Sequence, residues 1–121
     1  MKKRPKIRSS VNNLYDMYSY PEKLIKHKSG FNLTQGIYDV VFDENIEFIL
    51  NIITQHKKNS NFETWHFCRE QYENKFSLTG RNKLGNKFLE IPNIVSDFYF
   101  DDFVIIKKET LLCLPIEEKL Y

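Results

Sequence analysis

The sequence has few of the residues that build disulfide scaffolds, metal clusters and catalytic loops. It contains only two cysteines, Cys68 and Cys113, which are far apart and outside any C-x-x-C pair. Two such cysteines are too few for a disulfide framework. No glycine-rich stretch ends in the Gly-Lys-Ser/Thr sequence that cradles phosphates, and no G-x-S-x-G nucleophile motif is present. These absences predict a protein without catalytic machinery of its own.

The chain also lacks a long hydrophobic run. Its longest apolar region, from Ile46 to Ile53, is interrupted by Glu47 and Asn51, whereas a membrane span needs about 20 apolar residues. The basic start of the chain leads into polar residues instead of the apolar stretch of a signal peptide. Its composition, rich in Lys, Asn, Ile and Phe, is typical of AT-rich bacterial or phage genomes. We therefore expect a cytoplasmic protein of a bacterial host cell, with no membrane partner.

What the chain does contain is the composition of one globular domain. Of its 121 residues, 41% are hydrophobic and 28% are charged, and aromatics reach 15%. A chain of this size forms one domain, and a chain this rich in aromatics is not disordered throughout. Residues 1–13 lack apolar periodicity, and Pro5 prevents a helix through their basic cluster. We predict a basic flexible arm over residues 1–13 and a single α+β domain over residues 14–121.

The charge is unevenly distributed along the chain. The formal net charge is +2, but residues 1–30 carry eight basic and two acidic residues, and the remaining residues have a net charge of −4. A basic segment on an acidic body suggests attraction to a polyanion or to an acidic surface. The alternative interpretation is a solvated tail that aids solubility.

Two helices are predicted between residues 34 and 56. Thr34 can cap a helix through its hydroxyl, and Ile37, Val40 and Val41 follow on one helical face. A stronger stripe of the same period runs from Ile46 to Ile53. These patterns favour two consecutive helices.

Beyond residue 61 the hydrophobic pattern changes to a period of two, which indicates strands. Short polar turns between successive strands favour antiparallel pairing. The sequence therefore predicts an α+β fold in which the N-terminal helices pack on one face of a roughly five-stranded antiparallel meander sheet. The expected strands cover residues 62–70, 76–78, 87–91, 98–100 with 103–106 around Asp101-Asp102, and 111–114.

Four sequence blocks, in this order, carry a resemblance to a known family. From about residue 33 to the C-terminus the chain resembles a small bacterial family of unknown function that also occurs on plasmids and phages. The resemblance implies an α+β fold and a mobile-element origin, and it implies no activity. The blocks are Leu33-Thr34-Gln35-Gly36, Phe62-Glu63-Thr64-Trp65, Asp97-Phe98-Tyr99-Phe100-Asp101-Asp102-Phe103 and Leu111-Leu112-Cys113-Leu114-Pro115.

A zinc site is one candidate for chemistry. His66 and Cys68 alternate onto one face of a predicted strand, and Cys113 lies on another strand. Zinc sites use His and Cys ligands with matched spacing, but a fourth ligand is not evident. Buried cysteines also act as small hydrophobes. We predict no metal and no cofactor.

An acidic cluster is the second candidate. Asp97, Asp101 and Asp102 precede a predicted strand, and neighbouring carboxylates can bind magnesium or divide acid and base roles. In a turn, however, Asp residues also serve as backbone caps. Whether these three bind a metal stays open at this point.

Basic residues form the third candidate, a binding surface. A glycine-containing turn carries Arg81, Lys83 and Lys87, and loops often carry function. Tyr18 lies between the basic clusters, where it can stack on a base or join a small core. The predicted residues for binding a partner or nucleic acid are Lys2, Lys3, Arg4, Lys6, Arg8, Tyr18, Lys23, Lys26, Lys28, Arg81, Lys83 and Lys87.

Together these features favour a non-catalytic macromolecule-binding protein, not an enzyme. We expect a phage or mobile-element inhibitor of a bacterial defence complex, anti-CRISPR-like in size and composition, that binds a protein or its guide RNA. The expected partner is a protein or ribonucleoprotein complex of the bacterial host, with an RNA contact through the basic N-terminal region. One alternative is a direct RNA- or DNA-binding protein, and a second is a small metal-dependent hydrolase.

Overall fold

Strands dominate the described part of the chain. The structure is a computed structural model that describes residues 23–56, 61–70 and 74–120, so the predicted arm over residues 1–13 lies outside it. In chain order the elements are β1 (Ile25–Lys26), β2 (Asn32–Leu33), α1 (Gln35–Asp43), α2 (Phe48–Gln55), β3 (Phe62–Arg69), β4 (Lys75–Asn82), β5 (Lys87–Val95), β6 (Asp102–Lys108), β7 (Leu111–Cys113) and the 3-10 helix η2 (Pro115–Leu120).

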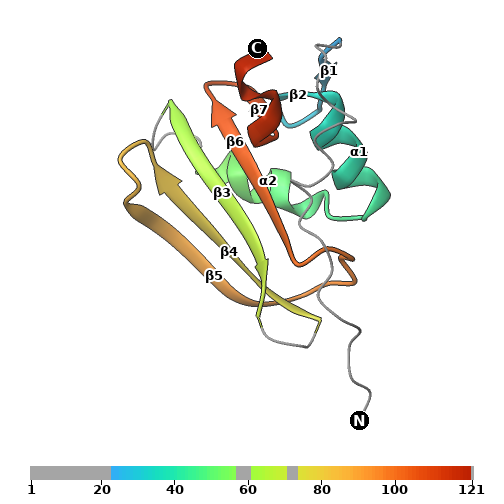
Figure 1. The fold of residues 1–121 in the computed structure, drawn as a ribbon, viewed down its shortest axis with the longest axis vertical. Helices are drawn as coiled ribbons and strands as arrows, with labels where there is room; N and C mark the ends of the chain where they lie inside the picture. Colours follow the sequence, from blue (N-terminus) through green and yellow to red (C-terminus); the bar gives the residue numbers. More distant parts are fainter. Residues whose placement is uncertain (1–22, 57–60, 71–73, 121) are drawn as a thin grey trace.

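These strands form one seven-stranded mixed sheet in the order β1-β2-β7-β6-β3-β4-β5 (Figure 1). Neighbouring strands are antiparallel, except that β2 and β7 run parallel. The long strand β3 lies inside the sheet, with β4 on one side and β6 on the other. From β3 to β5 the chain follows a meander, and β6 then returns to pair with β3 instead of β5.

The predicted fold, helices on a five-stranded antiparallel meander, is therefore wrong. The sheet has two further strands, β1 and β2, which are only two residues long and show no alternating pattern. The meander ends at β5, an edge strand that contains Pro92, and a residue without an N–H group suits that position. Residues 98–100, predicted as part of a strand, have no regular structure.

The two α-helices agree better with the prediction. Helix α1 follows Thr34, whose side chain accepts a hydrogen bond from the backbone N–H of Ile37 at 3.4 Å. Helix α2 buries Ile49, Leu50 and Ile53, the stripe that the sequence showed. Among the described residues, no helix is long and apolar enough to cross a membrane.

The hydrophobic core lies between the helices and one face of the sheet. Trp65 and Phe67 of β3 are fully buried on this face, and Phe48 of α2 meets the Phe67 ring edge-on. The rings of Phe67 and Phe76 stack with their centroids 4.6 Å apart. Figure 1 shows α2 behind the sheet. Each fully buried large apolar side chain contributes about 1.5–3 kcal/mol, so this aromatic layer is a principal source of stability.

Candidate functional site

The turn between β4 and β5 is built by its own hydrogen bonds. The side-chain oxygen of Asn82 accepts hydrogen bonds from the backbone N–H groups of Leu84 and Asn86, each at 3.0 Å. Gly85 adopts a φ of +88°, which a residue with a side chain rarely tolerates. The side-chain capping by Asn and the positive φ of Gly are local turn chemistry. They hold the turn in one shape.

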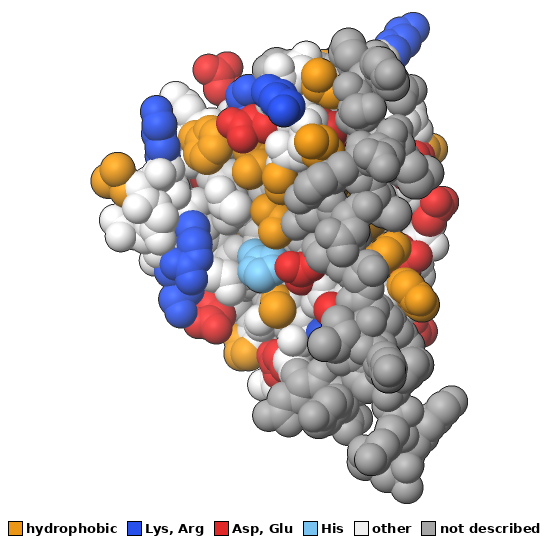
Figure 2. All heavy atoms as spheres, viewed as in Figure 1, with side chains coloured by type: hydrophobic (Ala, Val, Ile, Leu, Met, Phe, Trp, Pro, Cys, Tyr) orange, Lys and Arg blue, Asp and Glu red, His pale blue; other side chains and the backbone are white. Residues whose placement is uncertain are grey.

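This turn carries one exposed apolar residue among cations. We define the hairpin tip as Arg81, Lys83, Leu84 and Lys87. Leu84 is 84% exposed, the highest value among the large hydrophobic residues of the described chain. The three cations are also exposed. In Figure 2 a hydrophobic side chain projects at the left edge of the molecule, where Figure 1 places the β4–β5 turn, with a basic side chain beside it.

Two of the tip's cations are positioned by contacts within the hairpin. Arg81 donates from Nη1 to the carbonyl oxygen of Gly85 at 3.1 Å. Lys87 pairs with Glu90 across 2.6 Å between Nζ and Oε1. Both pairs are exposed, so they contribute little to stability. They hold the Arg81 side chain against the turn, and Glu90 offsets the charge of Lys87.

The structure separates the other predicted binding residues from this tip. Lys23, Lys26 and Lys28 are exposed around β1, the opposite edge strand from β5. Six strand spacings of about 4.8 Å separate these edges by roughly 29 Å. The two basic groups are therefore distinct surfaces. The remaining predicted residues lie outside the described residues, and they are Lys2, Lys3, Arg4, Lys6, Arg8 and Tyr18.

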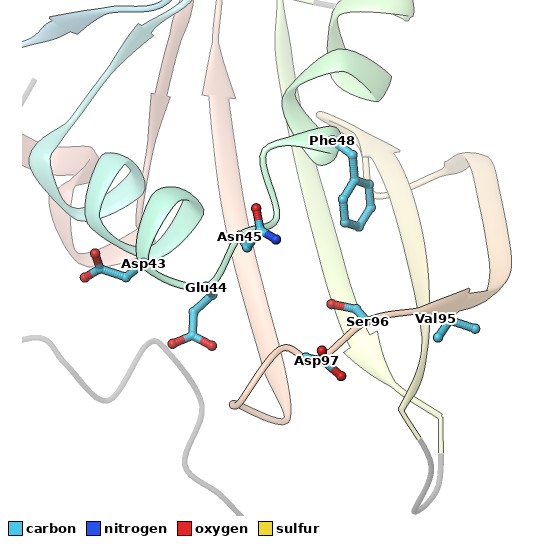
Figure 3. A pocket seen from close by; sticks show the side chains of 7 residues that line it. All are labelled: Asp43, Glu44, Asn45, Phe48, Val95, Ser96 and Asp97. Atoms are coloured by element: carbon cyan, nitrogen blue, oxygen red, sulfur yellow. The ribbon is translucent and has the colours of Figure 1, made fainter.

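A second surface is an open cleft of about 500 Å³ between the α1–α2 corner and the end of β5 (Figure 3). Figure 3 shows the side chains at the end of α1 on one side, those that follow β5 on the other, and an aromatic ring from the first turn of α2. We call it the acidic cleft. It is lined by Asp43, Glu44, Asn45, Phe48, Val95, Ser96 and Asp97.

The charge of the acidic cleft is not explained by local stability. Asp43 is the last residue of α1 and Glu44 is its C-cap, and the last turn of α1 contains no basic residue. The C-terminal end of a helix carries a partial negative charge, so carboxylates there are unfavourable. Asp97 adds a third carboxylate from across the cleft. The helix end and the carboxylates of Glu44 and Asp97 favour a cationic ligand, whereas Figure 3 shows the Asp43 side chain directed away from the residues that follow β5.

A hydrogen bond between a side chain and the backbone joins the two walls of the cleft. Glu44 accepts a hydrogen bond at Oε1 from the backbone N–H of Tyr99 at 3.0 Å. Arg69, whose side chain is 3% exposed, donates to the carbonyl oxygens of Phe98 and Phe100 at 2.8 and 3.1 Å. The segment that follows Asp97 is therefore held from both sides. Because its backbone is anchored, the cleft has a defined shape.

The predicted acidic cluster is divided by the fold. Asp101 pairs with Arg69 across 3.0 Å. Asp102 lies 3.2 Å from Nε2 of His66, and Asp97 faces the acidic cleft. Among the described residues, no group of three His, Cys, Asp or Glu side chains is arranged to hold a metal ion.

The predicted zinc ligands are also separated. Cys68 lies opposite Asp102 in the β3–β6 ladder, whereas Cys113 lies opposite Ile106 in the β6–β7 ladder. Burial raises the pKa of the Cys113 thiol to about 12. Burial, with smaller effects from the Asp102 and Asp101 carboxylates, also raises the pKa of Cys68. Metal ligation needs thiolates, so neither environment favours it.

Sequence reasoning missed several polar residues that the fold brings together. Asp43 and Glu44 had a visible signal, since acidic residues at the end of a predicted helix break the usual charge preference. Glu63 had none: it is fully buried, accepts a hydrogen bond from the Trp65 indole at 2.9 Å and lies 3.9 Å from Lys107. Lys107 is its partner in the β3–β6 register, which the sequence did not reveal.

Comparisons with known proteins find no match. No family model matches the chain, and neither a curated protein nor a solved structure does. The resemblance described above therefore stays a prediction.

Proposed function

We propose that this chain is a non-catalytic macromolecule-binding protein that docks its hairpin tip on an acidic protein surface. The observation that carries the proposal is Leu84, 84% exposed on an ordered turn and surrounded by cations. Interfaces draw most of their binding energy from a few anchors that fill pockets, and a charged rim supports them. An ordered tip loses little conformational entropy on binding.

The exposed residue favours a protein partner over a nucleic acid. Single-stranded nucleic acids bind to aromatic side chains, on which their bases stack, and leucine has no aromatic face. An acidic protein surface with an apolar pocket matches both the cations and Leu84. The cations would also accelerate encounter with such a surface. Inhibition of a bacterial defence complex is the specific form of this proposal, and it places the partner in the bacterial host.

The test is capture of a host protein by the full chain and by three variants. Leu84→Asp and Lys83→Glu alter the hairpin tip. Lys75→Glu reverses an exposed charge at the opposite end of β4 and serves as the matched control. Each tagged protein is incubated with nuclease-treated host lysate. We expect Leu84→Asp to reduce capture of a defined partner by about tenfold or more, because an anchor residue is lost.

The outcomes separate the two classes of partner. Capture that survives nuclease, falls with both tip variants and persists with Lys75→Glu supports the proposal. Equal capture by the native chain and both tip variants would contradict it. Binding to purified RNA or DNA that falls steeply with salt and ignores Leu84→Asp would replace it with direct nucleic-acid binding.

A further inference from the structure

The hairpin tip and the acidic cleft have complementary chemistry. The tip presents three cations around an exposed Leu84. The cleft is lined by three acidic residues, the negative end of α1 and the apolar side chains of Phe48 and Val95. We propose that the hairpin tip of one copy of this chain inserts into the acidic cleft of a second copy. The inference rests on the proposed function only in using the same hairpin.

The apolar parts of the two surfaces also correspond. Val95 is 76% exposed at the cleft, and Phe48 presents part of its ring there. The cleft volume of about 500 Å³ falls in the range of sites that enclose drug-sized ligands. The cleft is therefore larger than one leucine side chain. Insertion of Leu84 would remove Leu84, Val95 and the exposed part of Phe48 from water at once. Apolar burial is the main driving force for association.

The contact must form between two molecules. The hairpin tip precedes β5 and the cleft follows it, so the two lie at opposite ends of one strand. The nine residues of β5 extend over roughly 26 Å at about 3.3 Å per step. An extended, paired strand cannot fold back on itself, so the tip of a molecule cannot reach its own cleft. A second copy can supply it.

Such a contact is head-to-tail, because different surfaces meet. After the first contact, the pair as a whole keeps one free tip and one free cleft. Head-to-tail contacts make a ring if the rotation closes and a filament if it does not. The proposal therefore predicts a mass that rises with concentration. It also predicts that salt weakens the assembly, because the Debye screening length falls from about 10 Å at 0.1 M to about 3 Å at 1 M.

The first measurement is sedimentation velocity of the full chain over a concentration series. At low ionic strength we expect the weight-average mass to exceed that of the 14.6 kDa chain and to fall toward it in 1 M salt. Leu84→Asp should abolish the association, and Lys119→Glu, which reverses an exposed charge on η2, should leave it unchanged. A monomer at every concentration and ionic strength would overturn the inference.

Charge reversal gives the decisive experiment. A tip variant carries Arg81→Glu and Lys83→Glu, and a cleft variant carries Asp43→Lys and Asp97→Lys. Each variant alone should stay monomeric, because its tip and its cleft then carry charges of the same sign. An equimolar mixture should associate again, since the acidic tip of one variant matches the basic cleft of the other. Two monomeric variants that fail to associate when mixed would overturn the inference.

Folding controls keep the result interpretable. All altered positions are exposed, so thermal melting should be unchanged. Asp43→Lys should even stabilise α1 slightly, because a cation suits the C-terminal end of a helix. The cleft variant also distinguishes the two proposals. If it loses self-association but still captures a host partner, both stand. If the native chain is monomeric yet captures a partner through its tip, only the proposed function stands.

Discussion

The carboxylate of Glu117 lies at the N-terminus of α1, where it accepts a hydrogen bond from the hydroxyl of Thr34. It also accepts hydrogen bonds from the backbone N–H groups of Gly36 and Leu114, at 3.1 and 3.0 Å. Glu117 is 2% exposed. An acidic side chain suits the positive end of a helix. This contact ties η2 to the first helix across most of the described chain.

Replacing Glu117 with alanine should destabilise the fold strongly. The change removes the acceptor of three buried donors, and each unsatisfied donor costs about 1–3 kcal/mol. Because such losses are not additive, we expect the free energy of unfolding to fall by about 3 kcal/mol. Urea denaturation measures it. Glu118→Ala, at the next position, should change stability by only a few tenths of a kcal/mol. A loss below about 1 kcal/mol for Glu117→Ala would contradict this role.

Gly36 should not accept a side chain. A Cβ atom there would lie 2.5 Å from Cδ1 of Leu114 and 2.9 Å from Oε1 of Glu117. Overpacking of this kind costs about 1–3 kcal/mol, so we expect Gly36→Ala to lower the free energy of unfolding by that amount. Combining Gly36→Ala with Leu114→Ala removes the shorter contact. The double variant should therefore lose less stability than the sum of the losses of the two single variants. Strict additivity in this cycle would show that the crowding is absent.

Arg69 should position the segment that borders the acidic cleft. Its guanidinium contacts Asp101, three carbonyl oxygens and the face of Phe76, 4.6 Å from the ring centroid. Lysine cannot reproduce this planar set of donors. Arg69→Lys should cost about 2 kcal/mol and speed hydrogen exchange of the Tyr99 amide, which is bound to Glu44. Arg81→Lys, at the exposed hairpin tip, is the matched control. Unchanged exchange at Tyr99 would argue against the role of Arg69.

The buried Cys113 thiol should make the stability of the fold decline at alkaline pH. Its pKa is raised to about 12 in the fold from an ordinary value of 9.0. The unfolded chain therefore loses this proton first, so the thiol's contribution to stability is complete below pH 9 and declines as pH rises toward 12. Cys113→Ala should show a smaller alkaline loss of stability than the native chain. Equal pH profiles from pH 8 to 11 would contradict the shift.

Thiol labelling checks the same environment directly. At pH 8, iodoacetamide should modify Cys68 slowly and Cys113 only after unfolding, because Cys113 is fully buried. In urea both should react alike. Rapid labelling of Cys113 in the native protein would show that β7 is accessible.

Several local features were readable from the sequence because neighbouring residues create them. The hydroxyl of Thr34 caps α1, and the stripe from Ile46 to Ile53 lies on one face of α2. Helix caps and periodicity act within a few residues of chain. The turn at Gly85 is of the same kind. The helices were predicted close to their observed positions, whereas the turn is shorter than predicted, because β4 continues to Asn82.

Only the tertiary structure decided the order of the strands. The two residues of β2 form a strand because β7 lies beside them, with Asn32 opposite Leu111. The backbone N–H of Asn32 donates to the carbonyl oxygen of Thr110 at 2.8 Å. A pairing between such distant segments leaves no periodic pattern in so short a strand.

The candidate surfaces show the same division. The sequence by itself determined a cationic turn, because Arg81, Lys83 and Lys87 lie close together in the chain. It did not determine that Leu84 would be exposed among them, nor that Asp97 would line the same cleft as the acidic residues at the end of α1. Short-range chemistry depends on adjacent residues. A cleft depends on which distant segments pack together, and the buried core and strand pairing decide that.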